Sequence, residues 1–363
     1  MFKKTQIALF VALVVPGVTL AEISYEAVGV NADDSKAVLA FTWDPTREGG
    51  NISETKQDGW QNTSETLQTA GGNAASIVIQ EGVKNIAKVV QDASSSGSAV
   101  LQQGAGNDAT AILAFADDSV SIIEQYGEDH TAFVDVLGAE NSSTVIQDGY
   151  GQEARAWLFG NGNTLDSVQV GSENGANVIV YGDDNTIDND QGGWGNIVAV
   201  GIGGQSNNVK TSQWGEGNNG QVTIVGQVNN VLLQQQGIAQ TANLVVEGNE
   251  NKVLSDQFES TGSRVHASVQ GDDNAVRATQ QFGTADTIQV DLLASDDNDI
   301  YLLQEHSAGN TIDIDFDNSS STFVAAFQTG LSNLADIDST GGSYDAIKVH
   351  QSGDSNTAVS VVK

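Results

Sequence analysis

Residues 177–200, NVIVYGDDNTIDNDQGGWGNIVAV, contain short runs of alternating side chains separated by turns rich in Gly, Asp and Asn. In the middle run, Asn185, Ile187, Asn189 and Gln191 share one face of an extended strand. A period of two indicates β-structure and excludes an amphipathic helix, whose period is 3.6. Gly and Asn readily take the left-handed backbone angles that tight turns require. The segment therefore predicts a unit of strand, turn, strand and turn.

The same unit recurs along most of the chain. Its most regular mark is a glutamine that returns every 22 to 24 residues. A fixed period of this length is typical of solenoids, in which each unit stacks only on its neighbours. The recurring glutamines are Gln57, Gln80, Gln102, Gln125, Gln147, Gln169, Gln191, Gln213, Gln235, Gln257, Gln280, Gln304, Gln328 and Gln351. Asparagines six residues before the glutamine mark a second position: Asn141, Asn163, Asn185, Asn207, Asn229, Asn251, Asn274 and Asn298.

Stacking the units in phase predicts an all-β fold, a parallel β-solenoid with two strands per rung and about 14 rungs over residues 51–363. Equivalent side chains then lie above one another, so we expect the Asn and Gln amides to form hydrogen-bonded ladders along the axis. A ladder explains why inward positions hold amides, since an isolated buried amide is costly. Among the inward positions of the first strands, only Asp345 places a charge inside.

Composition excludes several classes of partner. The chain has 47 acidic and 14 basic residues and a net charge of -33, so neither nucleic acid nor an anionic membrane surface is an expected partner. No segment after the N-terminus is apolar for long enough to insert into a membrane. The chain has no cysteine, so its stability must come from repetition and packing rather than from disulfides.

The first 50 residues differ from the repeats. Residues 1–21 combine Lys3 and Lys4, an apolar run and a small-residue end, which predicts a signal peptide and a secreted, extracellular protein. Residues 22–50 follow the repeat pattern poorly. Either an N-terminal cap or a secretion-targeting segment would fit them.

The pattern (Asn/Ser)-x5-Gln-x-Gly-x2-Asn-x-Ala resembles the curlin repeat of curli subunits, bacterial proteins that form extracellular amyloid fibres. The resemblance covers about 51–363, with departures such as the missing glycines at Glu259 and His306. It implies a homopolymer on the cell surface, a pilus-like fibre for adhesion and biofilm matrix. It also implies two kinds of partner, a nucleator subunit and an outer-membrane secretion pore. Whether this chain is a major subunit or a nucleator stays open.

No motif points to catalysis, a cofactor or a metal, and we expect no residues with these roles. The histidines His130, His266, His306 and His350 lack metal-ligand spacing and are interpreted as incidental surface or turn residues. Acid pairs such as Asp183-Asp184 favour solvated turns over calcium sites. Two other functions fit a β-solenoid: a monomeric surface adhesin, and a polysaccharide-active β-helix enzyme. Fibre formation and glycan turnover would distinguish them.

Overall fold

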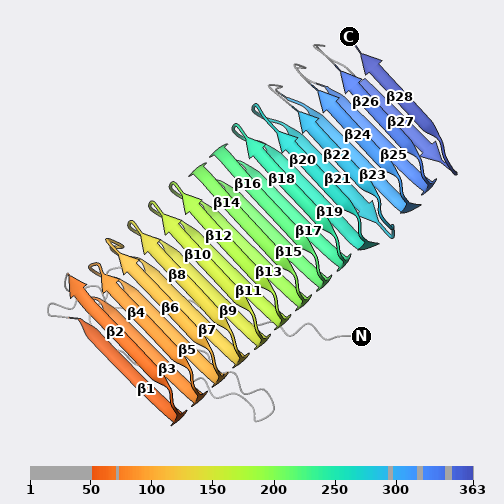
Figure 1. Cartoon of the computed structure of the whole chain (residues 1–363). Helices are drawn as coiled ribbons and strands as arrows, with labels where there is room; N and C mark the ends of the chain where they lie inside the picture. Colours follow the sequence, from red (N-terminus) through yellow and green to blue (C-terminus); the bar gives the residue numbers. More distant parts are fainter. Residues whose placement is uncertain (1–50, 71–72, 293–296, 317–321, 340–345, 363) are drawn as a thin grey trace, which may run out of the picture.

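The computed structural model describes residues 51–70, 73–292, 297–316, 322–339 and 346–362. Every regular element in these ranges is a β-strand, and the strands form two parallel sheets of fourteen strands each. Each rung contributes one strand to either sheet, and the rungs follow one another in chain order from one end to the other (Figure 1). The predicted two-strand-per-rung β-solenoid is confirmed.

The odd-numbered strands form the first sheet, sheet A: β1 (Ile52–Trp60), β3 (Ala75–Val83), β5 (Gly97–Ala105), β7 (Val120–Glu128), β9 (Ser142–Tyr150), β11 (Thr164–Ser172), β13 (Thr186–Trp194), β15 (Asn208–Glu216), β17 (Asn230–Ile238), β19 (Lys252–Thr261), β21 (Ala275–Gln281), β23 (Asp299–Ala308), β25 (Phe323–Leu331) and β27 (Ala346–Ser352). The even-numbered strands form sheet B: β2 (Thr63–Ala70), β4 (Ile86–Asp92), β6 (Asp108–Ala114), β8 (Thr131–Leu137), β10 (Glu153–Phe159), β12 (Gly175–Tyr181), β14 (Ile197–Gln205), β16 (Asn219–Gln227), β18 (Thr241–Glu247), β20 (Arg264–Val269), β22 (Thr287–Leu292), β24 (Thr311–Phe316), β26 (Leu334–Ser339) and β28 (Thr357–Val362).

The core lies between the two sheets and follows the alternation of the sequence. Ile187 of sheet A and Val178 and Val200 of sheet B are all at most 2% exposed and belong to one continuous apolar cluster. Ile179, the neighbour of Val178, points outward and is half-buried. Each rung buries only a few apolar side chains, so the core is a thin column that no single rung could form alone.

The turns hold glycines at positions where a side chain has no room. Gly182 has a φ of 134°, and a Cβ on it would lie 1.8 Å from the carbonyl oxygen of Gly204 in the next rung. Glycine therefore allows both the left-handed backbone and the close stacking of successive turns.

Three consecutive units lack the glycine expected two residues after the glutamine and have Glu259, Phe282 and His306 in its place. In the first and third of these units the strand contains one extra residue. Gly237 pairs with Ser260 rather than with Glu259, and Ser307 rather than His306 pairs with Gly330. Glu259 and His306 take left-handed φ angles of 46° and 49° at these irregularities. The extra residue is absorbed as a bulge, and the glutamines on either side stay in register.

Several sequence predictions concern residues outside the described ranges. These are the signal peptide 1–21, the cap or targeting segment 22–50, and the inward charge of Asp345. Among the described residues, no helix has the length and apolar character needed to span a membrane.

Candidate functional site: the amide ladders and the open end rungs

The fourteen recurring glutamines form one continuous ladder inside sheet A. Each Nε2 donates to the Oε1 of the glutamine in the next rung, at 2.6 to 2.9 Å, from Gln57 at one end to Gln351 at the other. The glutamines between them are fully buried. The ladder therefore lies inside the rod along its whole length.

Most of these glutamines also connect the two sheets. The Nε2 of Gln169 donates to Gln191 at 2.9 Å and to the backbone carbonyl of Glu153 in sheet B at 3.0 Å, while its Oε1 accepts from Gln147. Both N–H groups and the carbonyl oxygen are thus engaged. Leaving such a group buried without a partner would cost about 1–3 kcal/mol, so the glutamine amides of neighbouring rungs stabilise one another.

The asparagines six positions before the glutamine form a second ladder, with the opposite hydrogen-bond direction. Asn185 donates its backbone N–H and its Nδ2 to Oδ1 of Asn163 in the preceding rung, at 3.1 and 3.0 Å, and its Nδ2 also donates to the Gly204 carbonyl at 3.0 Å. Asn207 in turn donates to Asn185. Between ladder side chains, each glutamine donates to the glutamine of the following rung, and each asparagine donates to the asparagine of the preceding rung.

A third column follows the other turn, five or six residues after each glutamine. Asn218 donates its backbone N–H to Oδ1 of Asn196, which donates to Asn174 in the same way. The sequence showed the asparagines of this column but not what replaces them elsewhere. The members are Asn62, Asn85, Asn107, His130, Gln152, Asn174, Asn196, Asn218, Gln240, Ser263, Asp286, Asn310, Asn333 and Asn356.

His130 occupies an asparagine position of this column, in the turn between β7 and β8, and is completely buried. It is therefore a turn residue, as one of its two interpretations had it, but not a surface residue. Its Nε2 lies 3.0 Å from the Tyr126 carbonyl, and its Nδ1 accepts the backbone N–H of Gln152 at 3.3 Å. These partners require the neutral imidazole with the proton on Nε2. Burial lowers the pKa of His130, in agreement with that assignment.

Asp286 is the second ionisable group in the column and is also fully buried. Its Oδ1 accepts the backbone N–H of Asn310 at 2.9 Å, and its Oδ2 accepts the hydroxyl of Ser307 at 2.8 Å. Burial raises the pKa of this carboxyl, and these hydrogen bonds offset part of the effect. The spacing after Gln280 could have placed Asp286 here, since it stands where other units have asparagine.

Within the described ranges, each end of the rod has a rung with one unpaired edge. Among the described strands, β1 and β2 pair only with the next rung, and β27 and β28 pair only with the preceding one; the two rungs lie at opposite ends in Figure 1. The first rung presents Oε1 of Gln57 and the backbone N–H of Asn62, whereas the last presents Nε2 of Gln351 and Oδ1 of Asn356. These groups continue the ladders outward.

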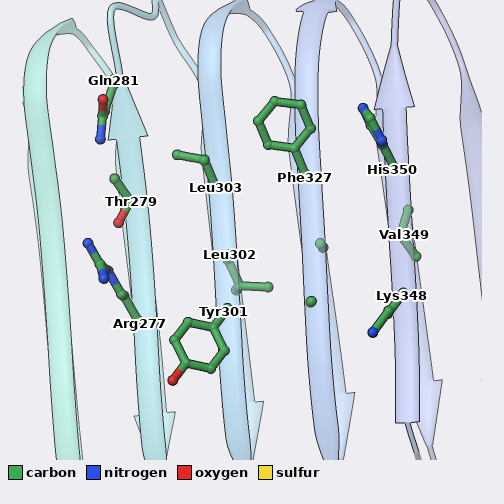
Figure 2. Close-up of a pocket in the computed structure, with 12 residues that line it drawn as sticks. Arg277, Thr279, Gln281, Tyr301, Leu302, Leu303, Phe327, Lys348, Val349 and His350 are labelled. Atoms are coloured by element: carbon green, nitrogen blue, oxygen red, sulfur yellow. The ribbon is translucent and has the colours of Figure 1, made fainter.

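A shallow groove of about 620 Å³ runs over the outer face of sheet A near the C-terminal end. Arg277, Tyr301, Ala325 and Lys348 form one register row across β21, β23, β25 and β27. Figure 2 shows the Tyr301 ring between Arg277 and Lys348, and the Phe327 ring farther along β25. The groove thus combines two aromatic surfaces with two cations.

Acidic side chains gather in columns on the outer faces of the strands. Burial, and next the nearby carboxylates of Asp188 and Asp190, raise the pKa of Asp166. Burial also raises the pKa of Asp313, and the neighbouring carboxylate of Asp336 raises it further. No group of carboxylates or histidines among the described residues has the arrangement of a metal site.

No protein-family model matches the sequence, and no curated protein matches it. The curlin resemblance therefore stays a prediction.

Proposed function

We propose that this protein is a secreted structural subunit that polymerises end to end into an extracellular, curli-like fibre. The observation that carries the proposal is that, among the described strands, both end rungs have open edges and the amide ladders reach as far as these rungs. Unpaired edges of this kind are natural sites for adding further strands.

The two end rungs match in register. When Gln351 of one copy stands opposite Gln57 of the next, Asn356 stands opposite Asn62, since both pairs are five residues apart. Nε2 of Gln351 can then donate to Oε1 of Gln57, and Oδ1 of Asn356 can accept from the Asn62 backbone. Both bonds have the direction found inside the rod.

The charges on the outer face also match in this register. Lys348, three residues before Gln351, comes to lie opposite Glu54, three residues before Gln57. Two identical ends cannot continue the parallel sheets, because a two-fold axis between them makes the strands antiparallel. The junction is therefore head to tail and can repeat without closing.

The proposed cellular role follows from the curlin resemblance together with this geometry. The subunit would be exported by its signal peptide, leave the cell through an outer-membrane pore and join a fibre begun by a nucleator subunit. The fibre would serve adhesion and biofilm matrix. The lack of catalytic activity remains a prediction, which an assay for glycan turnover would test.

Charge reversal across the junction tests the register. Lys348→Glu and Glu54→Lys should each slow seeded elongation of the purified mature chain, because each places like charges about one strand spacing apart. The double variant should restore much of the rate. Lys252→Glu, an exposed lysine away from both ends, is the control for net charge.

Fibres are measured by electron microscopy and by reflections near 4.7 and 10 Å in fibre diffraction. Failure of the double variant to recover would reject this register. If seeded native protein stays monomeric, the fibre function itself is wrong.

The groove favours a second candidate, a monomeric adhesin. Its aromatic rings can pack on sugar faces and its cations can pair with acidic groups of a glycan. A monomer that binds immobilised acidic glycan, and loses binding in Tyr301→Ala, would support the adhesin over the fibre.

A further inference from the structure

The outer face of sheet A is apolar over β3, β5, β7 and β9. Ile77, Leu101, Ile122 and Ile146 point away from the core here, because each precedes the inward glutamine of its rung by one or three residues. They are only 4%, 1%, 7% and 4% exposed. We call these residues, with Ile79, Glu124 and Tyr126, the covered strip.

Most corresponding outward positions on other rungs are exposed or half-buried, with Thr279 on β21 a buried exception. Tyr301 on β23 matches Ile122 in its spacing from the glutamine and is 45% exposed. Gln234 on β17 matches Leu101 and is also exposed. The low exposure of Ile122 and Leu101 therefore does not follow from the alternation of inward and outward side chains, which is the same in these strands.

The covered strip is separate from the core between the sheets. Leu101, Tyr126 and Ile146 form a second apolar cluster with Ile79 and Val168, all on the outer side of sheet A. Sheet B contacts the opposite face, so the strands of the rod cannot bury this one.

Polar groups in the strip are withdrawn from water as well. Glu124 is 5% exposed, and the Tyr126 hydroxyl donates to its carboxylate at 2.9 Å. Burial, and next the charge of Glu124, raise the pKa of Tyr126. Burying a carboxylate is costly unless charge and hydrogen bonds compensate, which favours a covering group that carries a cation.

We propose that residues 22–50 of the same chain bind over the covered strip. Of the chain outside the described residues, only the part before Asn51 is long enough, since the internal gaps hold at most residues 340–345. Asn51 leads into β1, the neighbour of β3. The strip spans four rungs, about 15 Å, and a segment of this length reaches several times that distance when extended.

The composition of the segment fits the strip. Residues 37–43, AVLAFTW, supply apolar side chains, and Lys36 directly before them supplies a cation for the neighbourhood of Glu124. The bound segment would brace the first rungs and block lateral contacts through this face. Growth would then be confined to the ends of the rod, although binding of the segment does not depend on fibre formation.

Cross-linking tests the contact directly, because the native chain has no cysteine. Single cysteines placed in turn at residues 37–43 are paired with Leu101→Cys in the monomeric mature chain and treated with a short bismaleimide. An intramolecular cross-link should form with Leu101→Cys, identified by peptide mass spectrometry, and should not form with the matched control Gln234→Cys. If no position in 37–43 cross-links to Leu101→Cys, or if both partners react equally, the proposal is overturned.

Proteolysis gives an independent readout. Leu101→Asp should speed tryptic cleavage after Lys36 and Arg47 several-fold, since it places a charge in the strip, while Gln234→Asp should leave the rate unchanged. Circular dichroism of both variants checks that the rod is folded. Equal cleavage rates in folded Leu101→Asp and native protein would contradict the proposal, whether or not either protein forms fibres.

Discussion

Because His130 stands where most rungs have asparagine, the stability of its rung depends on pH. His130 must stay neutral, because a proton on Nδ1 would face the backbone N–H of Gln152. Its folded pKa lies below the ordinary value, so its contribution to stability is complete above about pH 6.5 and is lost as the pH falls. The loss is at most about 1.4 kcal/mol per pH unit.

We therefore expect His130→Asn, which restores the usual residue of the column, to reduce the acid sensitivity of unfolding between pH 7 and 5. This acid sensitivity is measured by urea unfolding at several pH values, followed by circular dichroism. His350→Asn, at an exposed histidine near the C-terminal end, is the matched control for replacing a histidine by asparagine. An unchanged slope in His130→Asn would mean that the imidazole can be protonated inside the rod.

Spacing in the sequence located the glutamine and asparagine columns, because a constant period leaves little freedom in where a side chain lies. It was less informative about residues of other types in the same columns. His130 stands five residues after Gln125, the asparagine position, yet its residue type suggested an incidental surface or turn residue rather than a buried one. Asp286 lies six residues after Gln280. Position in the period was a better guide to burial here than residue type.

At the scale of the strand, alternation fixes which substitutions the rod tolerates. Val178 is 1% exposed and faces the core, whereas Ile179 next to it points outward. Val178→Asp should destabilise the rod by about 3 kcal/mol or more, because it buries an unpaired charge. Ile179→Asp should cost less than about 1 kcal/mol.

Thermal unfolding of the two variants provides the comparison, with Val178→Ala as the control for lost volume. If the two aspartate variants lose equal stability, the facing of β12 is wrong.

Strand facing was predictable from the sequence, but two features of the strands were not. The burial of Leu101 and Ile146 depends on what covers the outer face, and a period of two does not contain that information. The bulges at Glu259 and His306 appeared in the sequence only as missing glycines. A single extra residue per strand can be accommodated in several ways, so its placement needed the structure.

For the whole molecule, charge opposes stacking. The chain carries a net charge of -33, and carboxylates of neighbouring strands approach one another, as Asp313 and Asp336 do in sheet B. The raised pKa of Asp313 means that the folded rod binds a proton there more readily than the unfolded chain does. Stability from this source is present at low pH and is lost as the pH rises through the folded pKa.

Lag times of assembly should therefore shorten from pH 8 to pH 5, and at pH 8 they should shorten on adding physiological salt, which screens the repulsion. Thioflavin fluorescence follows the lag. Asp313→Asn with Asp336→Asn should weaken the pH response more than the same number of changes at the turn residues Asp117 and Asp118. Lag times that ignore both pH and salt would rule out control by charge.

The repeat also determines how the rod resists tension. Backbone and ladder hydrogen bonds run along the axis and join each rung only to its neighbours, so a pulling force acts on all the bonds of one junction together, and rungs should detach one at a time. A released unit of 22 residues lengthens the chain by about 70 Å. Single-molecule force spectroscopy on one mature chain held by its two ends should give a regular series of such steps. One large step would show that the rod yields as a single mechanical unit.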